Sequence, residues 1–408
     1  MNASQDKLDV AAAPLFDIVL RNCHVIDPSQ NWNGTAAIGI HDGTIAAFAV
    51  DLDPALGRRV IDAAGTFVSP GWIDLHGHWY EAGLYGINAE LGLNHGVTTA
   101  VDAGTAGFAN FPAFHDTAIT RSRAQILAFV HISCLGLHAT FAEELLNLAY
   151  ARPEETAIIL DRFPGATAGV KVRIGSMTAS HGNQAFDLAL SSARMAKKPL
   201  MVHISAGADE KYILRSLRPG DILTHCFHGN QSRMFEAETG DLVPEARAAR
   251  ERGVIFDIGH GCGSFSWGSA QRAFEHDFQP DTISTDLHRY SIEPPWNVTM
   301  PEVLSKFLTL GMSLKDVIAK ATLAPAKALG RPRIGTLAIG TVADLVQFRL
   351  VEGEFLFTDS AQQTRLGAHR IEPILCIRKG IPYHPGDIQR PLRPLYPCDE
   401  AIFPPRRA

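Results

Sequence analysis

Residues of the kinds that bind metal ions recur where apolar runs of this chain end. His76 and His78 close the run of residues 70–78, which has the composition of a β-strand. Side chains alternate between the two faces of a strand, so histidines two residues apart point the same way and can bind one ion. A single His-x-His pair also occurs as two ordinary polar residues at a strand end. The later runs are therefore needed to choose between these interpretations.

Three later apolar runs end in further potential ligands. His203 closes residues 200–203, His225 closes residues 222–225, and Asp286 closes residues 282–286. Each of these residues, taken singly, is more often a hydrogen-bonded structural residue than a ligand. Their shared position at strand ends, together with the histidine pair, predicts one metal centre.

Lys171 is the unusual member of the set, because it lies inside the apolar run 168–173. An ammonium group is costly to bury unless it is paired or chemically altered. One interpretation is a salt bridge to Asp102 or another carboxylate. The other is that CO2 adds to the neutral amine and forms a carbamate, whose two oxygens can bridge two cations.

The runs themselves indicate the fold that positions these residues. Segments with helical spacing of apolar residues, such as 186–196, 243–252 and 300–310, separate most of the runs. Strands that alternate with helices pair in parallel, and eight such units predict an α/β fold, the (β/α)8 TIM barrel, with its active site at the carboxyl ends of the strands. The eight predicted strands lie in residues 70–78, 97–102, 126–131, 168–173, 200–203, 222–225, 254–260 and 282–286.

Both ends of the chain differ from this middle part. Short alternating runs at residues 16–22, 36–40 and 44–48 are matched by runs at 343–348, 355–357 and 374–377. We therefore expect a small β-sandwich-like domain built from residues 1–66 plus 332–408, and a barrel domain at residues 67–331. The Pro-rich tail after Tyr383 is expected to be irregular and is a candidate to wrap around a neighbouring subunit.

Composition limits the classes of partner. The 408 residues carry a formal net charge of −6 and are 46% hydrophobic and 20% charged, which is typical of a globular protein and gives no support for a nucleic-acid partner. No apolar stretch reaches the ~20 residues that span a bilayer, and the N-terminus lacks the pattern of a signal peptide. We expect a cytoplasmic protein without a membrane partner. Its six scattered cysteines are expected to be reduced thiols.

The ligand pattern resembles the binuclear members of the amidohydrolase superfamily. The match is a His-x-His on strand one, a lysine on strand four, histidines on strands five and six, and an aspartate on strand eight; residues 321–326 and 335–345 are also similar. The resemblance implies that His76, His78 and Asp286 hold the more buried of two divalent metal ions and that His203 and His225 hold the outer one. Carbamylated Lys171 and a hydroxide would bridge the two ions. Zinc suits imidazole and carboxylate ligands, although manganese, iron or cobalt fit the same donors.

This resemblance also implies a mechanism. A hydroxide between two metal ions attacks a carbonyl that the outer ion polarises. Asp286 takes the proton from that hydroxide and passes it to the leaving nitrogen or oxygen. The expected activity is therefore metal-dependent hydrolysis of an amide or ester.

Substrate features are less specific. Dihydroorotase-like relatives carry an arginine just after the His-x-His, whereas Trp, Tyr, Glu, Ala and Gly follow here at residues 79–83. The pattern looks more like the bacterial deacetylase branch, which acts on small acylated acids. Arg173 lies on the same strand face as Lys171 and could bind a substrate carboxylate, or form a structural salt bridge. The other candidates for substrate contact are His228, Tyr80 and His260, although His260 could equally order its own loop.

Two other functions are compatible with the sequence. The first is a cyclic amidase of the hydantoinase or dihydroorotase type, which opens a ring and releases no acetate. The second is an inactive binding protein on the same scaffold, which the complete ligand set argues against. A small-molecule substrate and a homo-oligomer are expected in either enzymatic case.

Overall fold

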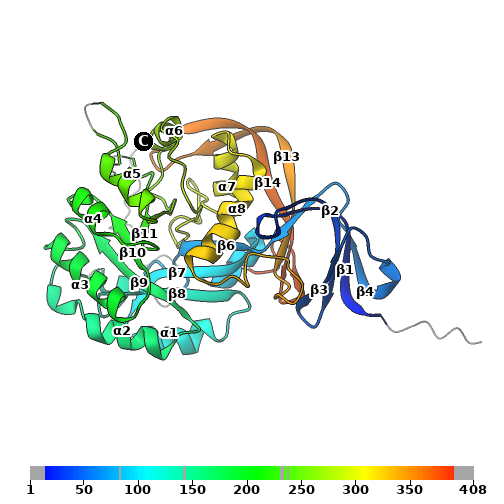
Figure 1. Cartoon of the computed structure of the whole chain (residues 1–408), viewed down its shortest axis with the longest axis horizontal. Coiled ribbons are helices and arrows are strands. Elements are labelled where there is room, and N and C mark those ends of the chain that lie inside the picture. The colour runs from blue at the N-terminus through cyan, green and yellow to red at the C-terminus, as the bar shows by residue number, and fades with distance from the viewer. Residues whose placement is uncertain (1–13, 82–83, 141–143, 230–233, 237–238, 390–408) are drawn as a thin grey trace, which may run out of the picture.

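The computed structural model describes residues 14–81, 84–140, 144–229, 234–236 and 239–389. Most of the Pro-rich tail, including Cys398, lies outside these residues. The centre of the molecule is a curled parallel sheet in the order β12-β11-β10-β9-β8-β7-β6 (Figure 1). Its strands are β6 (Trp72–Gly77), β7 (Val97–Gly107), β8 (Gln125–His131), β9 (Thr167–Ile174), β10 (Leu200–Ile204), β11 (Ile222–Thr224) and β12 (Ile255–Phe256).

The segment at residues 282–287 closes this sheet. It was expected to be a regular eighth strand, but it pairs through isolated parallel bridges, Asp257 with Thr282 and Gly77 with Leu287. The Asp286 amide donates to the His76 carbonyl at 2.6 Å and so joins the segment to β6. The result is a TIM-barrel-like domain in which the first and last strand positions are adjacent.

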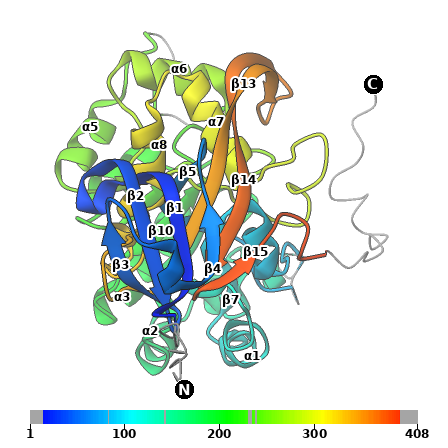
Figure 2. The same ribbon diagram turned by 90° about the vertical axis from the view of Figure 1, so that its right-hand side faces the viewer.

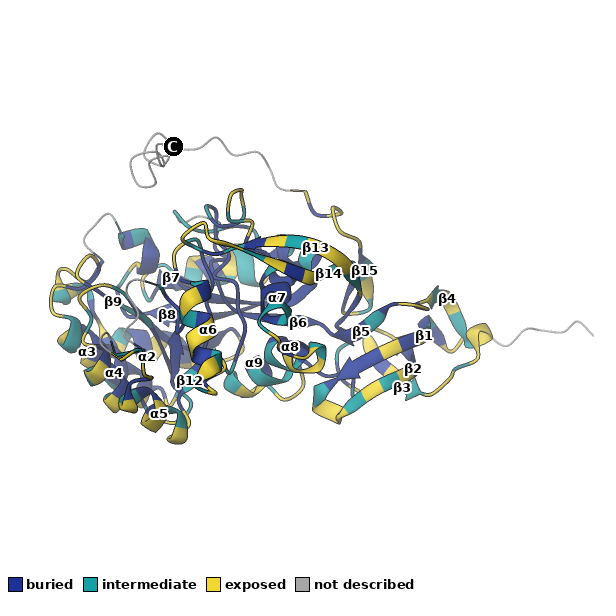
Figure 3. Cartoon of the chain, turned by 90° about the horizontal axis from the view of Figure 1, so that it is seen from above, coloured by how far each residue is buried: buried dark blue, intermediate teal, exposed yellow. Residues whose placement is uncertain are grey.

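Helices cover the outside of the curled sheet (Figure 1). In α3, Ala185, Phe186, Ala189, Leu190 and Ala193 are buried, a spacing that gives the helix one apolar face toward the sheet. Figure 3 shows buried residues along the sheet and exposed ones on the outer helices. The helices are α1 (Phe111–Phe114), α2 (Pro153–Arg162), α3 (Gly182–Met195), α4 (Glu210–Ser216), α5 (Pro244–Glu251), α6 (Trp267–Glu275), α7 (Met300–Thr309), α8 (Leu314–Ala321) and α9 (Leu323–Ala328).

Short helical segments fill several connections. The segments η1 (Pro28–Gln30), η2 (Pro54–Leu56), η3 (Ala89–His95), η5 (Gly136–Ala139) and η6 (Leu148–Tyr150) are 3-10 turns, and η4 (His115–Ile119) is a π-type turn.

A second sheet combines strands from both ends of the chain, in the order β15-β14-β13-β5-β1-β2-β3, with β4 paired to β1 (Figure 2). Its buried side has its own apolar cluster, which includes Leu20, Ile38, Val68 and Leu345. The strands form one continuous hydrogen-bonded sheet, so the expected two-sheet sandwich is not confirmed. The strands are β1 (Phe16–Asp27), β2 (Trp32–His41), β3 (Thr44–Ala49), β4 (Gly57–Asp62), β5 (Phe67–Pro70), β13 (Leu345–Thr358), β14 (Thr364–Arg378) and β15 (Ile381–Tyr383).

The long hairpin of β13 and β14 connects this sheet to the barrel. Figures 1 and 3 show it running from the terminal strands toward α6. Near its turn, Asp359 accepts a hydrogen bond from the Trp267 amide at 3.1 Å, and the Ser360 hydroxyl accepts one from the Phe265 amide at 3.0 Å. Residues near the C-terminus therefore hold the segment that follows β12.

The five cysteines within the described ranges are free thiols. Among the helices that the structure describes, none is long and apolar enough to cross a membrane. Association into a homo-oligomer stays a prediction.

Candidate metal centre

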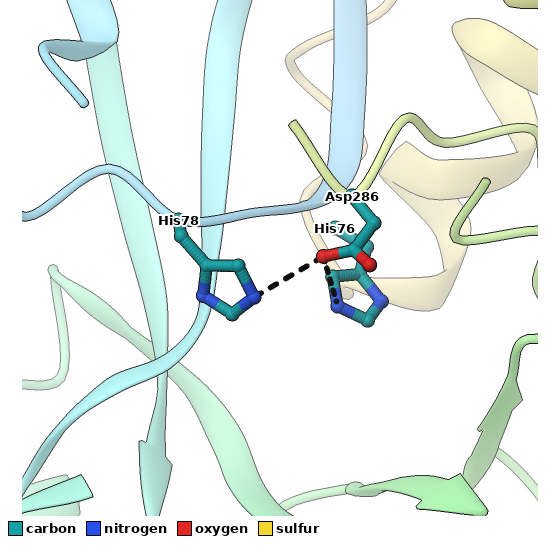
Figure 4. A group of neighbouring side chains, drawn as sticks. All are labelled: His76, His78 and Asp286. Atoms are coloured by element: carbon teal, nitrogen blue, oxygen red, sulfur yellow. Dashed lines mark ion pairs between the residues drawn. The ribbon is translucent and has the colours of Figure 1, made fainter. Parts of the chain in front are cut away.

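His76, His78 and Asp286 meet at the carboxyl end of the barrel (Figure 4). The Nε2 atoms of His76 and His78 lie 3.3 and 3.1 Å from Asp286 Oδ1, and one potential ligand atom from each residue falls within 4.8 Å of the others. Burial alone would raise the pKa of the Asp286 carboxyl, but the His76 charge and hydrogen bonds from both histidines hold this pKa well below its usual value. Two imidazoles and one carboxylate at this spacing can bind one divalent ion.

The other ring nitrogen of each histidine, Nδ1, contacts a threonine hydroxyl of the barrel. His76 Nδ1 lies 2.7 Å from the Thr224 hydroxyl, and that hydroxyl donates its hydrogen to Asp257 at 2.8 Å. The Thr224 oxygen can therefore only accept from His76, so Nδ1 carries a proton and Nε2, which faces Asp286, is the ring nitrogen available to a metal ion. His78 Nδ1 is similarly placed 3.0 Å from the Thr105 hydroxyl. Such contacts orient metal-binding histidines in proteins.

Substituting Thr224 by valine tests this orientation. The substitution preserves the shape of the side chain but removes the acceptor for His76 Nδ1. Loss of an outer partner of this kind lowers metal affinity by about 10- to 100-fold, and we expect that result in a competition assay against a chromogenic chelator. The control is Thr322→Val, because Thr322 is equally buried but donates to the Ile318 carbonyl of its own helix. Equal affinities in the two variants would contradict the assigned role.

Lys171 enters the same site from β9 with its amine buried. Its Nζ has no hydrogen-bond partner among the described residues, and burial lowers its pKa to about 7. Gly104, at a φ of +89°, makes room for it, since a Cβ there would lie 2.7 Å from Lys171 Cγ. Asp102, the alternative salt-bridge partner, accepts from the Trp79, Gly104 and Thr105 amides at 2.7 to 3.0 Å instead.

His203 and His225 stand beside this group. Their ring centroids are 4.3 Å apart, and those of His225 and His76 are 4.9 Å apart. Burial lowers the pKa of both imidazoles well below the usual value, so they are neutral and able to bind a metal. His225 Nδ1 donates to the Gly259 carbonyl at 2.7 Å, and its buried Nε2 lacks a partner within the described structure.

Two of the predicted ligand positions have an unusual backbone. His225 and Asp286 have φ values of +65° and +50°, in the left-handed region that non-glycine residues seldom occupy. Backbone strain of this kind persists where the surrounding structure enforces it and is concentrated at functional sites.

These residues surround a cavity of about 390 Å³. Five of the six predicted ligands line it, and the sixth, His225, packs behind His76 and His203. The predicted substrate residues Arg173 and His228 also line the cavity. Lining residues that the sequence analysis did not place there are Tyr85, Leu137, Ser205, Cys262, Gly263, Ser264 and His288.

Arg173 lies next to a buried carboxylate that the sequence analysis missed. Its guanidinium is 3.5 Å from Glu144 Oε2, it shares a hydrogen bond with Tyr85, and it remains 17% exposed. Glu144 also lies 3.3 Å from His131 Nε2. Glu144 and Tyr85 come from irregular connections, where apolar periodicity gives no signal, whereas Arg173 and His131 lie on predicted strands and could be detected.

Two predicted substrate residues do not reach the cavity. Tyr80 stacks on Phe114 with ring centroids 4.5 Å apart, and it lines a different hollow. His260 is fully buried against Phe265; its Nδ1 lies 2.8 Å from the Gly261 carbonyl and its Nε2 lies 2.9 Å from Lys306 Nζ. The structure therefore favours the alternative in which His260 orders its loop.

Comparison with known proteins shows that this chain is similar to one protein family and to two bacterial deacetylases. Residues 267–368 match the family model for the amidohydrolase family. The chain is 32% identical to a deacetylase of Enterococcus faecalis, over 90% of this chain and 98% of that protein. It is 36% identical to a deacetylase of Brucella anthropi, over 78% of this chain and 80% of that protein.

Two solved structures are each similar to 90% of this chain. One described as an adenine deaminase has a TM-score of 0.84 and 31% identity, covering 90% of this chain and 100% of that one. Another described as a dihydroorotase has a TM-score of 0.82 and 33% identity, covering 90% of this chain and 99% of that one.

Proposed function

The chain belongs to the amidohydrolase family and is a hydrolase acting on carbon–nitrogen bonds, and from this premise we propose that it is a metal-dependent deacetylase of small acylated acids. The observation that carries the proposal is the convergence of His76, His78 and Asp286 with the buried Lys171 amine beside Arg173 in one cavity. The names of these two relatives support the choice of an acyl group.

The donor set fits two divalent ions. His76, His78 and Asp286 would hold one, and His203 and His225 the other, with Lys171 as a carbamate between them. Among the described residues, Nε2 of His225 and Nζ of Lys171 have no hydrogen-bond partner, and this supports the assignment because buried polar atoms in native proteins normally have partners. Zinc is the proposed ion. Two such ions would supply Lewis-acid activation of a water molecule and of the scissile carbonyl.

Asp286 is the proposed proton carrier. Its Oδ1 faces both His76 and His78, and its low pKa keeps it ionised and able to accept a proton. It would take the proton that the attacking water loses and deliver it to the leaving nitrogen or oxygen. The His76 tautomer set by Thr224 keeps the ring from taking that proton at its Nδ1 atom.

Arg173 is the proposed contact for the substrate carboxylate. It lies two residues beyond Lys171 on one face of β9, a separation of about 6.6 Å along the strand. In an N-acetylated amino acid or an acetylated α-hydroxy acid, three bonds separate the acyl carbon from the carboxylate carbon. A substrate of that size can place its acyl group at the metal ligands and its carboxylate at the guanidinium.

Substituting Arg173 by glutamine is expected to discriminate between carboxylate and neutral substrates. Loss of a charge-assisted hydrogen bond costs about 2 kcal/mol, or roughly thirtyfold in kcat/KM, for the acid. The corresponding carboxamide should change little. The control is Arg215→Gln, since Arg215 pairs with Glu245 on the exposed surface. Equal losses for acid and carboxamide would show that Arg173 has a structural role only.

The second candidate is a cyclic amidase, favoured by the likeness to the dihydroorotase structure. One panel separates the candidates: zinc-loaded protein, prepared with bicarbonate, is given N-acetylated amino acids of both hands, acetylated α-hydroxy acids, dihydroorotate, hydantoins and adenine. Acetate release supports the deacetylase. Ring opening without acetate release would identify the protein as a cyclic amidase. Ammonia release from adenine would contradict both proposals.

A further inference from the structure

Lys306, on α7, is a fully buried lysine outside the metal centre. Its ammonium donates to the Thr358 carbonyl at 2.7 Å and contacts His260 Nε2 at 2.9 Å. Neither partner is a carboxylate, and the negative charges that favour the ammonium are those of Glu302 and Asp359. A buried cation held by neutral acceptors is costly to the fold, so what its two contacts hold in place is of interest.

The contact with His260 has a defined direction. His260 Nδ1 lies 2.8 Å from the Gly261 carbonyl, which can only accept, so the imidazole proton is on Nδ1. Nε2 then carries a lone pair toward Lys306 and accepts from the ammonium. The ring is also stacked on Phe265 at 4.7 Å, which fixes its plane. Lys306 therefore holds the loop that begins at His260.

That loop forms one wall of the catalytic cavity. Cys262, Gly263 and Ser264 line the cavity directly. Gly261, at a φ of +50°, packs so closely on the Asp286 carboxylate that a Cβ there would lie 2.4 Å from Oδ2. A small movement of this loop would therefore change both the shape of the cavity and the packing of Gly261 against the Asp286 carboxylate.

The other partner of Lys306 comes from the terminal sheet. Thr358 ends β13, and the adjacent Asp359 and Ser360 bind the Trp267 and Phe265 amides. Lys306 therefore connects the β13–β14 hairpin of the terminal sheet to the cavity loop that begins at His260 in the barrel. We propose that Lys306 is a positioning residue that clamps the loop of residues 260–264 against the β13–β14 hairpin and thereby sets the substrate-binding wall of the cavity.

Hydrogen exchange tests the clamp without any substrate. In Lys306→Met, the amides of Gly261, Ser264 and Phe265, which donate to Thr285, His260 and Ser360, are expected to exchange about tenfold faster, while amides of α3 stay unchanged. The control is Lys320→Met, since Lys320 also donates to a backbone carbonyl, that of Pro280, away from the cavity. Should Lys306→Met not fold, His260→Leu removes the same contact and must give the same local loss of protection.

The kinetic consequence rests on the proposed function. With the acylated acid that wild type hydrolyses best, Lys306→Met should raise KM roughly tenfold and lower kcat by less, as expected for a displaced binding wall. His260→Gln, which keeps an acceptor for the Lys306 ammonium, should have a KM close to that of wild type. Unchanged loop protection in both Lys306→Met and His260→Leu would overturn the clamp. Faster loop exchange without turnover of any acylated acid would support the clamp while contradicting the proposed function.

Discussion

Replacing Lys171 by alanine is expected to lower kcat/KM about a thousandfold and to reduce bound metal from two equivalents toward one. The side chain is buried among the predicted ligands without another partner in the described structure, so its removal deletes a bridging anion that no neighbour replaces. A loss of about 4 kcal/mol in transition-state stabilisation corresponds to that change in rate. The measurements are steady-state kinetics and metal analysis of the dialysed protein.

A short carboxylic acid separates the carbamate from a structural lysine. Propionate or formate can occupy the space left in Lys171→Ala and supply two bridging oxygens, so partial rescue is expected at millimolar concentrations. The control is Lys320→Ala, which should retain wild-type activity and show no response to the added acid. Wild-type activity in Lys171→Ala would refute the bridging role.

Replacing Asp286 by asparagine is expected to abolish measurable turnover while most of the metal is retained. The amide oxygen can still coordinate, but the side chain no longer accepts a proton, and general acid–base catalysis contributes about 10²- to 10⁴-fold. Rapid-quench assays with metal analysis of the same sample test both statements. Asp161→Asn, a change on the exposed face of α2, is the control. An active Asp286→Asn enzyme would remove Asp286 from the proton transfer.

The sequence predicted the barrel because its signals are local. Apolar runs ending in His76, His131, His203 and His225 coincide with strands or their ends, and the intervening helices follow the expected spacing. The eighth strand was harder to predict, because its segment pairs through isolated bridges and Asp286 has a positive φ. The terminal strands were detected, but their pairing into one sheet depends on contacts between residues more than 250 positions apart, such as Val68 and Gln347.

The ligand set and the substrate residues differ in how far they can be predicted. The direction of His76 and Lys171 follows from strand alternation, which fixes the face of each side chain within a strand, and His78 lies only one residue past the end of β6. Tyr80 and His260 lie beyond strand ends, where that rule fails; Gly259, at a φ of +47°, precedes His260, and this ring turns toward Lys306. Glu144 has no sequence signal at all, because only the folded connection brings it to Arg173.

Titration of the metal-free protein with zinc tests whether acetate release requires two bound metal ions. The chelated enzyme is mixed with increasing zinc in bicarbonate buffer, and bound metal and acetate release are measured on each sample. We expect no acetate release from the metal-free protein and full activity at two equivalents of bound zinc. Acetate release by the metal-free protein, or saturation of binding well below two equivalents, would contradict it.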